Sequence, residues 1–534
     1  MHRGQIADFL RRGLRPSLSD LLLASMVGWL FVAGQGWSAL LADGDTGWHI
    51  RTGEWILDHR SVPVTDLFSF SRSGAPWFAW EWLSDVLMAL VHRAWGLAGV
   101  AALAGCLIAL AAMVLFRHML WRGAHVLVAL PVVLLATGAS SMHYLARPHI
   151  FTLLFLAVSL WLLERDRRTP GGAVWLLVPL SALWINLHGG FFALPATLAV
   201  LAAGTCIEAG LDRRQRSSKW AAARRLAALT AATLGASLLN PYGIGLHRHV
   251  ANYLTSDWIR GAVEEFQSPR FRSEGLLQFE LLLLAALLVA GTLLARRRVA
   301  DALLVIFWAH LALASVRHVP LFAIVNAPLV AVEISRLWEA WASRGSPQSI
   351  GRILWTLGVD LSPGFRHFSF WAPALVAAVM LLTPADRWPR DFPDSRFPAS
   401  LVRYEFSRLS AARVFTSDQW GDYLIYRGWP HQRVFIDGRS DFYGPAVGSD
   451  YLLLMEARPG WGNLLRKYEI GAVLLPREWP LGELLARDPE WRRIREDGMA
   501  VLYERSGGPS SGTNSKAELG RYQEGRHITW TADF

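Results

Sequence analysis

Long apolar runs alternate with short polar segments through the first 384 residues of the chain. A helix that crosses the hydrocarbon core of a bilayer needs roughly 20 mainly apolar residues. Eleven runs approach that length, at 21–41, 97–116, 124–141, 147–163, 173–188, 190–210, 224–240, 276–295, 300–316, 319–334 and 367–384. The pattern predicts a polytopic α-helical membrane domain over residues 1–384 with about 11 transmembrane helices, and a first outer loop at 42–96.

Basic residues predict how these helices are oriented. Four arginines precede the first run, which is longer than the roughly 7 to 15 residues of a signal-peptide core, so we expect a retained helix with a cytoplasmic N-terminus. If the helical segment 81–95 stays on the outer side, all later basic clusters face the cytoplasm, as the positive-inside rule requires. The N-terminal arginines are Arg3, Arg11, Arg12 and Arg15, and the later clusters are Arg117 and Arg122; Arg165, Arg167 and Arg168; Arg213, Arg214, Arg216, Lys219, Arg224 and Arg225; and Arg296, Arg297 and Arg298.

The pattern changes after the last apolar run. A linker rich in Pro, Asp and Arg at 385–400 leads to short β-like runs at 413–416, 433–436, 472–475 and 500–503, which alternate with helical runs near 452–457, 462–468 and 481–487. This alternation predicts a small α/β domain over 401–505. By the helix count it is periplasmic or extracellular, and the Gly/Ser/Thr-rich residues 506–534 are expected to form a disordered tail.

Composition places the chain in a membrane. Hydrophobic residues make up 53% of the sequence and charged residues only 18%, with 26 tryptophans that suit interfacial belts. The net charge of +10 would fit nucleic acid, but the arginines fall in short loops between apolar runs, so membrane lipids and no nucleic acid are the expected partners. Cys106 and Cys206 lie inside apolar runs, and we expect neither a disulfide nor a metal site from them.

The first outer loop carries the densest chemistry. Asp43 and Asp45 lie immediately outside a membrane-length helix, where a carboxylate is costly unless it faces water or a polar cavity. A short amphipathic helix on the bilayer surface is predicted from Trp48 to Asp58, and Glu81 follows among tryptophans. We interpret the loop as the reaction chamber of a membrane enzyme, with Asp45, Asp43 and Glu81 as candidate catalytic carboxylates.

Other polar clusters lie at helix ends on the same predicted side, so they can converge on this loop. Their cationic and donor side chains could hold a phosphate or pyrophosphate leaving group. The alternative for Arg147 and Arg317 is a snorkelling arginine at a helix end, and for the turn that contains Tyr242 it is a helix stop with a tight turn. The case for His188 is stronger, because the Asn186-Leu-His188 pair lies between two apolar runs without an obvious solvating partner. The candidates are Arg147, His149, His188, Arg317 and His318 for the phosphate, with Asn186 and Tyr242 nearby.

The C-terminal domain has a candidate site of its own. Asp437-Gly-Arg439-Ser-Asp441 can hold a carbohydrate or a cation through its carboxylates, and aromatic neighbours can stack on sugar. An ordinary turn with an internal Arg/Asp pair is the alternative.

The whole architecture, with the Asp43-Gly-Asp45-Thr-Gly-Trp48-His49 loop and Glu81-Trp-Leu, resembles the GT-C glycosyltransferases, which include protein mannosyltransferases, aminoarabinose transferases and oligosaccharyltransferases. Trp420-Gly-Asp422-Tyr is loosely similar to the Trp-Trp-Asp-Tyr-Gly acceptor motif of the last group, without its paired tryptophans and final glycine. The resemblance implies a polyprenyl-phosphate-sugar donor and an Asp that acts as base or as ligand of a divalent cation (Mg or Mn), here Asp45 or Asp43. The acceptor or sugar contacts would come from Trp48, His49, Asn186, Tyr242, Trp420, Asp422, Asp437, Arg439 and Asp441.

Three functions follow from these patterns. The first is inverting transfer of one hexosyl or pentosyl unit to a lipid, glycan or protein acceptor at the outer face of a bacterial inner membrane. The second is a glycan or lipid transporter or assembly partner without catalysis, although the internal repeats typical of transporters are not found in the sequence. The third is a ligase that moves whole glycans and relies on arginine and histidine. Replacing Asp45 by Asn separates them, because only the first predicts loss of transfer in a folded protein.

Overall fold

The computed structural model describes residues 13–31, 36–272, 276–367 and 369–506. The expected N-terminal arginines Arg3, Arg11 and Arg12 and the expected tail from 507 lie outside these residues. The chain divides into two compact units. We call residues 1–43, 52–62 and 78–390 the helical unit, and residues 44–51, 63–77 and 391–534 the sheet unit. The first outer loop is therefore shared between the two units, which its position in the sequence did not indicate.

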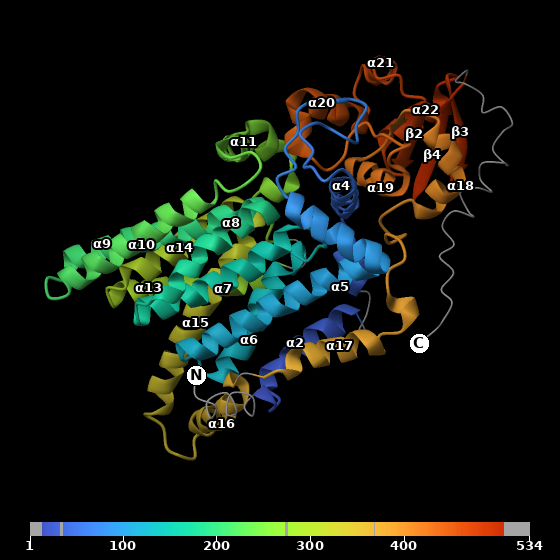
Figure 1. Ribbon diagram of the computed structural model, residues 1–534. Helices are drawn as coiled ribbons and strands as arrows, with labels where there is room; N and C mark the ends of the chain where they lie inside the picture. The colour runs from blue at the N-terminus through green and yellow to red at the C-terminus, as the bar shows by residue number, and fades with distance from the viewer. Residues whose placement is uncertain (1–12, 32–35, 273–275, 368, 507–534) are drawn as a thin grey trace. The chain divides into compact units, whose positions relative to one another are not determined.

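The helical unit is built of apolar helices packed side by side (Figure 1). Among them α5, α6, α7, α13, α14 and α15 pack against one another, as their uninterrupted apolar sequences predict. The helices are α2 (Leu18–Phe31), α3 (Gly36–Leu40), α5 (Trp82–Arg122), α6 (Val126–Ser140), α7 (His149–Arg168), α8 (Leu177–Leu187), α9 (Ala193–Leu211), α10 (Arg216–Ala236), α11 (Ile244–Thr255), α12 (Asp257–Ala262), α13 (Leu277–Ala295), α14 (Val299–Ala314), α15 (Val319–Ala342), α16 (Ile350–Arg366) and α17 (Trp371–Leu382).

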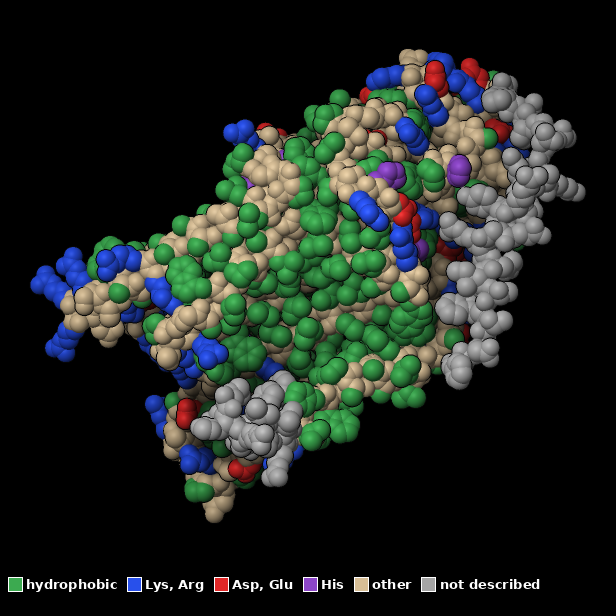
Figure 2. Space-filling model, viewed as in Figure 1, with side chains coloured by type: hydrophobic (Ala, Val, Ile, Leu, Met, Phe, Trp, Pro, Cys, Tyr) green, Lys and Arg blue, Asp and Glu red, His purple; other side chains and the backbone are tan. Residues whose placement is uncertain are grey.

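The surface of these helices fits a bilayer. Figure 2 shows hydrophobic side chains covering the visible face of the helical unit, and Leu288 and Leu381 are 75% and 85% exposed. An apolar surface this continuous is costly in water and is the surface that lipid covers. The described residues contain five helices long and apolar enough to cross a membrane, or six if α16 and α17 form one bent span, besides three shorter apolar helices. The polytopic helical class is thus confirmed, whereas the number eleven stays a prediction.

A break inside α5 falls between the segment 81–95 and the run at 97–116, whereas the outer position of that segment stays a prediction. Trp95 and Gly96 leave helical geometry inside α5, with φ of −146° and 57°, and so break the 41-residue helix in two. Gly96 can adopt the positive φ because it has no Cβ. The helices α11, α12 and α16 of the helical unit were not expected. α16, for example, is amphipathic rather than apolar, so a search for apolar runs passes over it.

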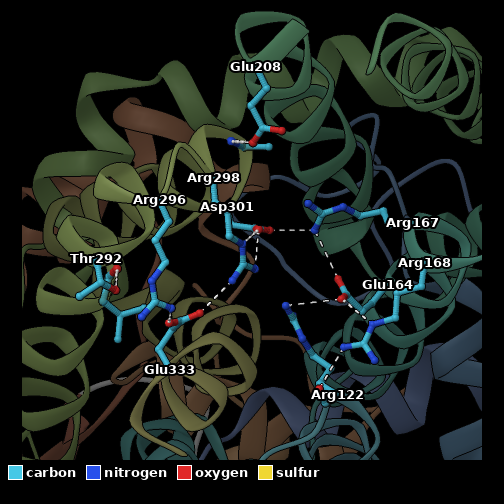
Figure 3. A network of polar contacts seen from close by, with 12 residues as sticks. Arg122, Glu164, Arg167, Arg168, Glu208, Thr292, Arg296, Arg298, Asp301 and Glu333 are labelled. Carbon is cyan, nitrogen blue, oxygen red and sulfur yellow. Dashed lines mark hydrogen bonds and ion pairs between the residues drawn. The ribbon is translucent and has the colours of Figure 1, made fainter. Parts of the chain in front are cut away.

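An ionic network joins helix ends in the helical unit (Figure 3). Arg167 of α7 bonds Asp301 of α14 at 2.8 Å, and Arg298 bonds Asp301 at 2.7 Å and Glu333 of α15 at 2.8 Å. Glu333 is only 1% exposed and also accepts from Arg296. Buried carboxylates are tolerated when they are paired in this way, so the network fixes how α7, α14 and α15 meet.

The sheet unit contains a four-stranded mixed sheet with the order β1-β2-β4-β3. Its strands are β1 (Val414–Phe415), β2 (Ala472–Pro476), β3 (Trp491–Glu496) and β4 (Ala500–Arg505), and its helices are α18 (Ala399–Ser410), α19 (Asp418–Gly428), α20 (Ser440–Met455), α21 (Trp461–Lys467) and α22 (Pro480–Arg487). β1 runs parallel to β2, and the other neighbours are antiparallel. The predicted small α/β domain is confirmed.

Two strand assignments from the sequence are wrong. Residues 433–436 form no strand, because Val434 makes only isolated bridges to Ser69 and Val414. The edge strand β3 was missed because its Arg- and Glu-rich sequence is mostly exposed and lacks an apolar alternation.

The first outer loop forms a helix where one was predicted. α4 (Asp45–His59) covers the amphipathic segment. Its start, in the sheet unit, is buried, with Trp48 6% and His49 1% exposed. The loop adds to this unit through Phe70 N–H, which donates to Val434 O at 3.0 Å. Its expected place on the bilayer surface stays a prediction.

Candidate functional site

Polar side chains from three separate loops of the helical unit meet at Arg147, immediately before α7. Arg147 Nη1 donates to Asp43 Oδ2 at 2.8 Å and to Glu265 Oε1 at 3.1 Å. Asp43 follows α3, and Glu265 lies in the short helix η4 (Glu264–Phe266) between α12 and α13. The three side chains are 21%, 13% and 31% exposed, so they are partly shielded but reachable from solvent.

Arg317, from the turn η5 (Val316–His318) before α15, completes this group. Its Nε lies 3.9 Å from Glu265 Oε2, and its Nη1 donates to Tyr253 Oη at 3.2 Å. We call Asp43, Arg147, Tyr253, Glu265 and Arg317 the arginine cluster. Burial alone would raise the pKa of Glu265, but Arg147 and Arg317 outweigh it and hold that pKa well below its usual range.

A second polar group surrounds His188 at the end of α8. Its Nδ1 accepts from Gly190 N–H at 2.9 Å and lies 2.8 Å from Thr152 Oγ1, which itself accepts from Trp184 Nε1. A backbone N–H can only donate, so Nδ1 is the unprotonated nitrogen and Nε2 carries the hydrogen. Nε2 faces Glu81 Oε1 at 3.4 Å, so the histidine presents its N–H to a carboxylate.

Two further predicted histidines lie near these groups. The rings of His149 and His188 are 6.3 Å apart, and His149 Nε2 donates to His143 O at 2.5 Å. His318 follows Arg317 in η5 and is partly buried.

Asn186 and Tyr242 hold the segment before α5 in place. Asn186 Oδ1 accepts from Trp82 Nε1 at 2.7 Å, while its Nδ2 donates to Leu239 O at 2.8 Å. Tyr242 Oη accepts from Ala79 N–H at 2.9 Å. Both side chains therefore position Glu81, which lies between Ala79 and Trp82 in the chain.

Asp45 belongs to the sheet unit, although it is two residues from Asp43. It is 4% exposed and lies close to Asp422 of α19, which is fully buried. A Cβ at Gly438 would collide with Asp45 Oδ1 and lie 3.1 Å from Asp422 Oδ2, so only glycine fits between the two carboxyl groups. Burial, followed by the charges of Asp45 and Asp437, raises the pKa of Asp422 well above its usual value.

The Asp-Gly-Arg motif is buried in the sheet unit. Arg439 is 3% exposed and donates to Asp437 Oδ2 at 2.6 Å and to Asp66 Oδ1 at 2.8 Å. Its guanidinium lies 4.6 Å from the ring centre of Trp77 and 5.0 Å from that of Phe68.

The other predicted contacts of the sheet unit differ in exposure. Trp420 is 5% exposed and donates through Nε1 to Arg396 O, whereas Asp441 is half-buried. Trp48 packs edge-on against Trp77. The sugar- or acceptor-binding roles of all these residues stay predictions.

The expected divalent cation also stays a prediction. Within the described ranges, no group of three or more His, Cys, Asp or Glu side chains is arranged to hold a metal ion. Asp43 is engaged with Arg147, so the residues around it offer no ready ligand set.

Sequence reasoning missed Glu265, Tyr253 and Thr152. Glu264-Glu265 was the available signal, since two acidic residues precede an apolar run in a loop that the helix count places outside. Tyr253 and Thr152 lie within helices, and nothing in the sequence distinguishes them from packing residues.

The chain is similar to solved structures, but no protein-family model and no curated protein matches it. A solved structure of ArnT from Cupriavidus metallidurans bound to undecaprenyl phosphate is similar, with 13% identity and a TM-score of 0.49, over 91% of this chain and 98% of that one. At this identity the similarity assigns no donor, acceptor or catalytic residue to the present chain.

Proposed function

We propose that this chain is a GT-C-type glycosyltransferase, which moves a sugar from a polyprenyl-phosphate-linked donor to a lipid, glycan or protein acceptor at the outer face of the inner membrane. The arginine cluster is the observation that carries the proposal. It brings two guanidinium groups, two carboxylates and a phenol together where apolar helices end, which suits a substrate with a lipid tail and a charged phosphate.

Arg147 and Arg317 would hold the phosphate. A planar guanidinium can bond two phosphate oxygens at once, and both arginines already flank one anion, Glu265. In the structure as it stands, Asp43 and Glu265 balance the two positive charges. A bound phosphate must therefore replace one carboxylate as a partner of Arg147, and Asp43 is the partner whose release would give the reaction a carboxylate base.

The following protein groups would then carry the transfer. The acceptor hydroxyl attacks the anomeric carbon, its proton passes to Asp43, and the bond from that carbon to the phosphate oxygen breaks, which inverts the configuration. The polyprenyl phosphate that departs gains a negative charge, which Arg147 and Arg317 stabilise. His188 presents Nε2–H beside Glu81 and would orient that carboxylate toward the sugar or the acceptor.

This assignment shifts the main base from Asp45 to Asp43. Asp43 contacts a phosphate-binding candidate directly, whereas Asp45 lies against Asp422 in the sheet unit. The variants Asp43→Asn and Asp45→Asn compare the two: loss of transfer in the first alone supports the proposal, and loss in the second alone returns the role to Asp45.

The test is transfer of a labelled sugar from a polyprenyl-phosphate donor in membranes, with equal amounts of each variant. Arg147→Ala should reduce the rate at least about a hundredfold, as loss of one oxyanion donor does. Arg147→Lys keeps the positive charge but lacks the planar guanidinium, so its transfer rate should lie between those of the wild type and Arg147→Ala. Arg213→Ala, an exposed arginine of another loop, is the control and should match the wild type. A normal rate in Arg147→Ala would mean that this arginine only ties loops together.

A glycan ligase remains the second candidate, because arginine and histidine outnumber carboxylates in this part of the helical unit. It predicts that Arg147→Ala and His188→Ala lose activity while Asp43→Asn and Asp45→Asn keep it. Transfer measured with EDTA, with and without added Mg²⁺ or Mn²⁺, tests the predicted cation separately.

A further inference from the structure

The sheet unit contains a cavity that is lined by none of the candidate site residues described above. Its volume is about 420 Å³, within the range of small-molecule sites. It lies where the first outer loop, the start of β1 and the segment before Val434 come together, and the bridges from Val434 to Ser69 and Val414 hold these three segments in register.

The charge of the lining is one-sided. Arg413 and Arg433 both line the cavity with His431, and among the residues that the structure describes no carboxylate does. Arg433 Nη1 donates to Ser73 Oγ at 2.7 Å, which holds the guanidinium at the rim. Arg413 pairs with Glu469 at 2.7 Å, but Glu469 lies outside the lining and is 75% exposed, so solvent weakens that pair.

The cavity also offers an aromatic surface and polar atoms. Phe70 lines one side, with the Arg413 guanidinium 5.5 Å from its ring centre. Ser73 and His431 add a hydroxyl group and an imidazole ring to the lining.

We propose that this cavity binds a saccharide that carries an acidic group, a phosphate or a carboxylate. Sugar hydroxyls can hydrogen-bond to side chains such as those of Ser73 and His431, a sugar ring can pack its apolar face on Phe70, and the acidic group would lie between Arg413 and Arg433. An inorganic anion would use the arginines alone and leave the aromatic ring and the polar wall unused. Only the use of this cavity as an acceptor site rests on the proposed transferase function. The binding of an acidic saccharide there does not depend on it.

The experiment measures binding to the full-length protein in detergent, without donor. The probes are glucose 1-phosphate, glucuronic acid, glucose and inorganic phosphate. The two acidic sugars should each bind at least about tenfold more tightly than glucose and than inorganic phosphate. The acidic sugar that binds more tightly shows whether the site prefers a phosphate or a carboxylate. Equal affinity for glucose, or for inorganic phosphate, would overturn the proposal.

Variants locate the site. Arg413→Gln and Arg433→Gln should each weaken binding of the tighter acidic sugar by about tenfold. Arg477→Gln is a matched control, because Arg477 is 52% exposed and paired with Glu496, much as Arg413 is 49% exposed and paired with Glu469. Unchanged binding in both cavity variants would refute the assignment.

A measurement without mutation is independent of folding. The affinity of the wild type for glucose 1-phosphate should fall as sodium chloride rises from about 50 to 300 mM, while that for glucose stays constant. A salt-independent affinity would contradict the role of the arginines. If the acidic sugars bind as expected but no sugar is transferred from any polyprenyl-phosphate donor, the proposed transferase function is wrong, whereas the proposed binding site is supported.

Discussion

Replacing Arg439 by alanine should strongly destabilise the sheet unit. Arg439 is 3% exposed and neutralises two carboxylates, Asp437 and Asp66, that are 1% and 7% exposed. Without the guanidinium, both carboxylates would remain buried beside each other with no cation. Burial by itself would lower the pKa of Arg439, yet Asp437, Tyr443 and Asp66 raise it well above its usual value. The Arg439 guanidinium therefore remains positively charged in the folded protein at every accessible pH.

The magnitude follows from the number of partners lost. Removing one member of a buried ion pair costs about 3 to 5 kcal/mol. Arg439 has two such partners, and four aromatic rings have centres within 6 Å of its guanidinium, so we expect the upper part of that range. In a unit of this size, larger than 100 residues, a loss of 1 kcal/mol lowers the unfolding midpoint by roughly 2 to 4 °C. The sheet unit of Arg439→Ala should therefore melt at least about 8 °C below the wild type.

The assay is thermal unfolding of the full-length protein in detergent, followed by tryptophan fluorescence. Limited proteolysis during the same ramp identifies which unit opens. Arg477→Ala is the control, because a surface pair such as Arg477 and Glu496 contributes at most about 1 kcal/mol.

A different outcome would refute this reasoning. If Arg439→Ala melts within about 2 °C of the wild type but no longer binds or transfers sugar, the motif is a ligand site. The sugar-binding role of Asp437 and Arg439 predicted from the sequence would then hold, and the ion pair would not be what stabilises the turn.

Three other predictions concern charge and topology. Asp422 has a raised pKa in the folded state, so the stability that it contributes is complete below pH 3.8 and is lost as the pH rises through the raised pKa. In unfolding curves at pH 4, 6 and 8, Asp422→Asn should therefore lose less stability with rising pH than the wild type does. An unchanged pH dependence of stability in this variant would contradict the prediction. Glu333→Gln should lower the melting temperature in detergent by several degrees, because three arginines then lose their shared carboxylate. Glu339 is exposed on the same helix, so Glu339→Gln should leave the melting temperature unchanged. Equal effects of the two variants would argue against a stabilising role of the ionic network around Glu333. A membrane-impermeant thiol reagent should label Ser73→Cys in intact cells but Ser217→Cys only after permeabilisation, in a background without native cysteines, and labelling of Ser217→Cys in intact cells would overturn the predicted orientation.

The sequence by itself determined the class of the protein and most of its elements. Apolar runs of membrane length must become helices in a bilayer, because no other local structure pairs every backbone polar group within the segment. The change of pattern after residue 400 likewise predicted a small α/β domain, since alternating short strands and helices have few other solutions. Hydropathy counts length and polarity only, so it missed the amphipathic α16 and the charged strand β3.

Only the tertiary structure decided which polar residues meet. Asp43 and Glu265 reach Arg147 from positions 104 and 118 residues away, and Arg439 bonds Asp66 across 373 residues. Asp43 and Asp45 look equivalent in the sequence, yet one pairs with an arginine and the other lies against a buried carboxyl group. Local sequence cannot encode such differences, because a side chain takes its charge partners and its burial from whichever distant segments the fold packs around it.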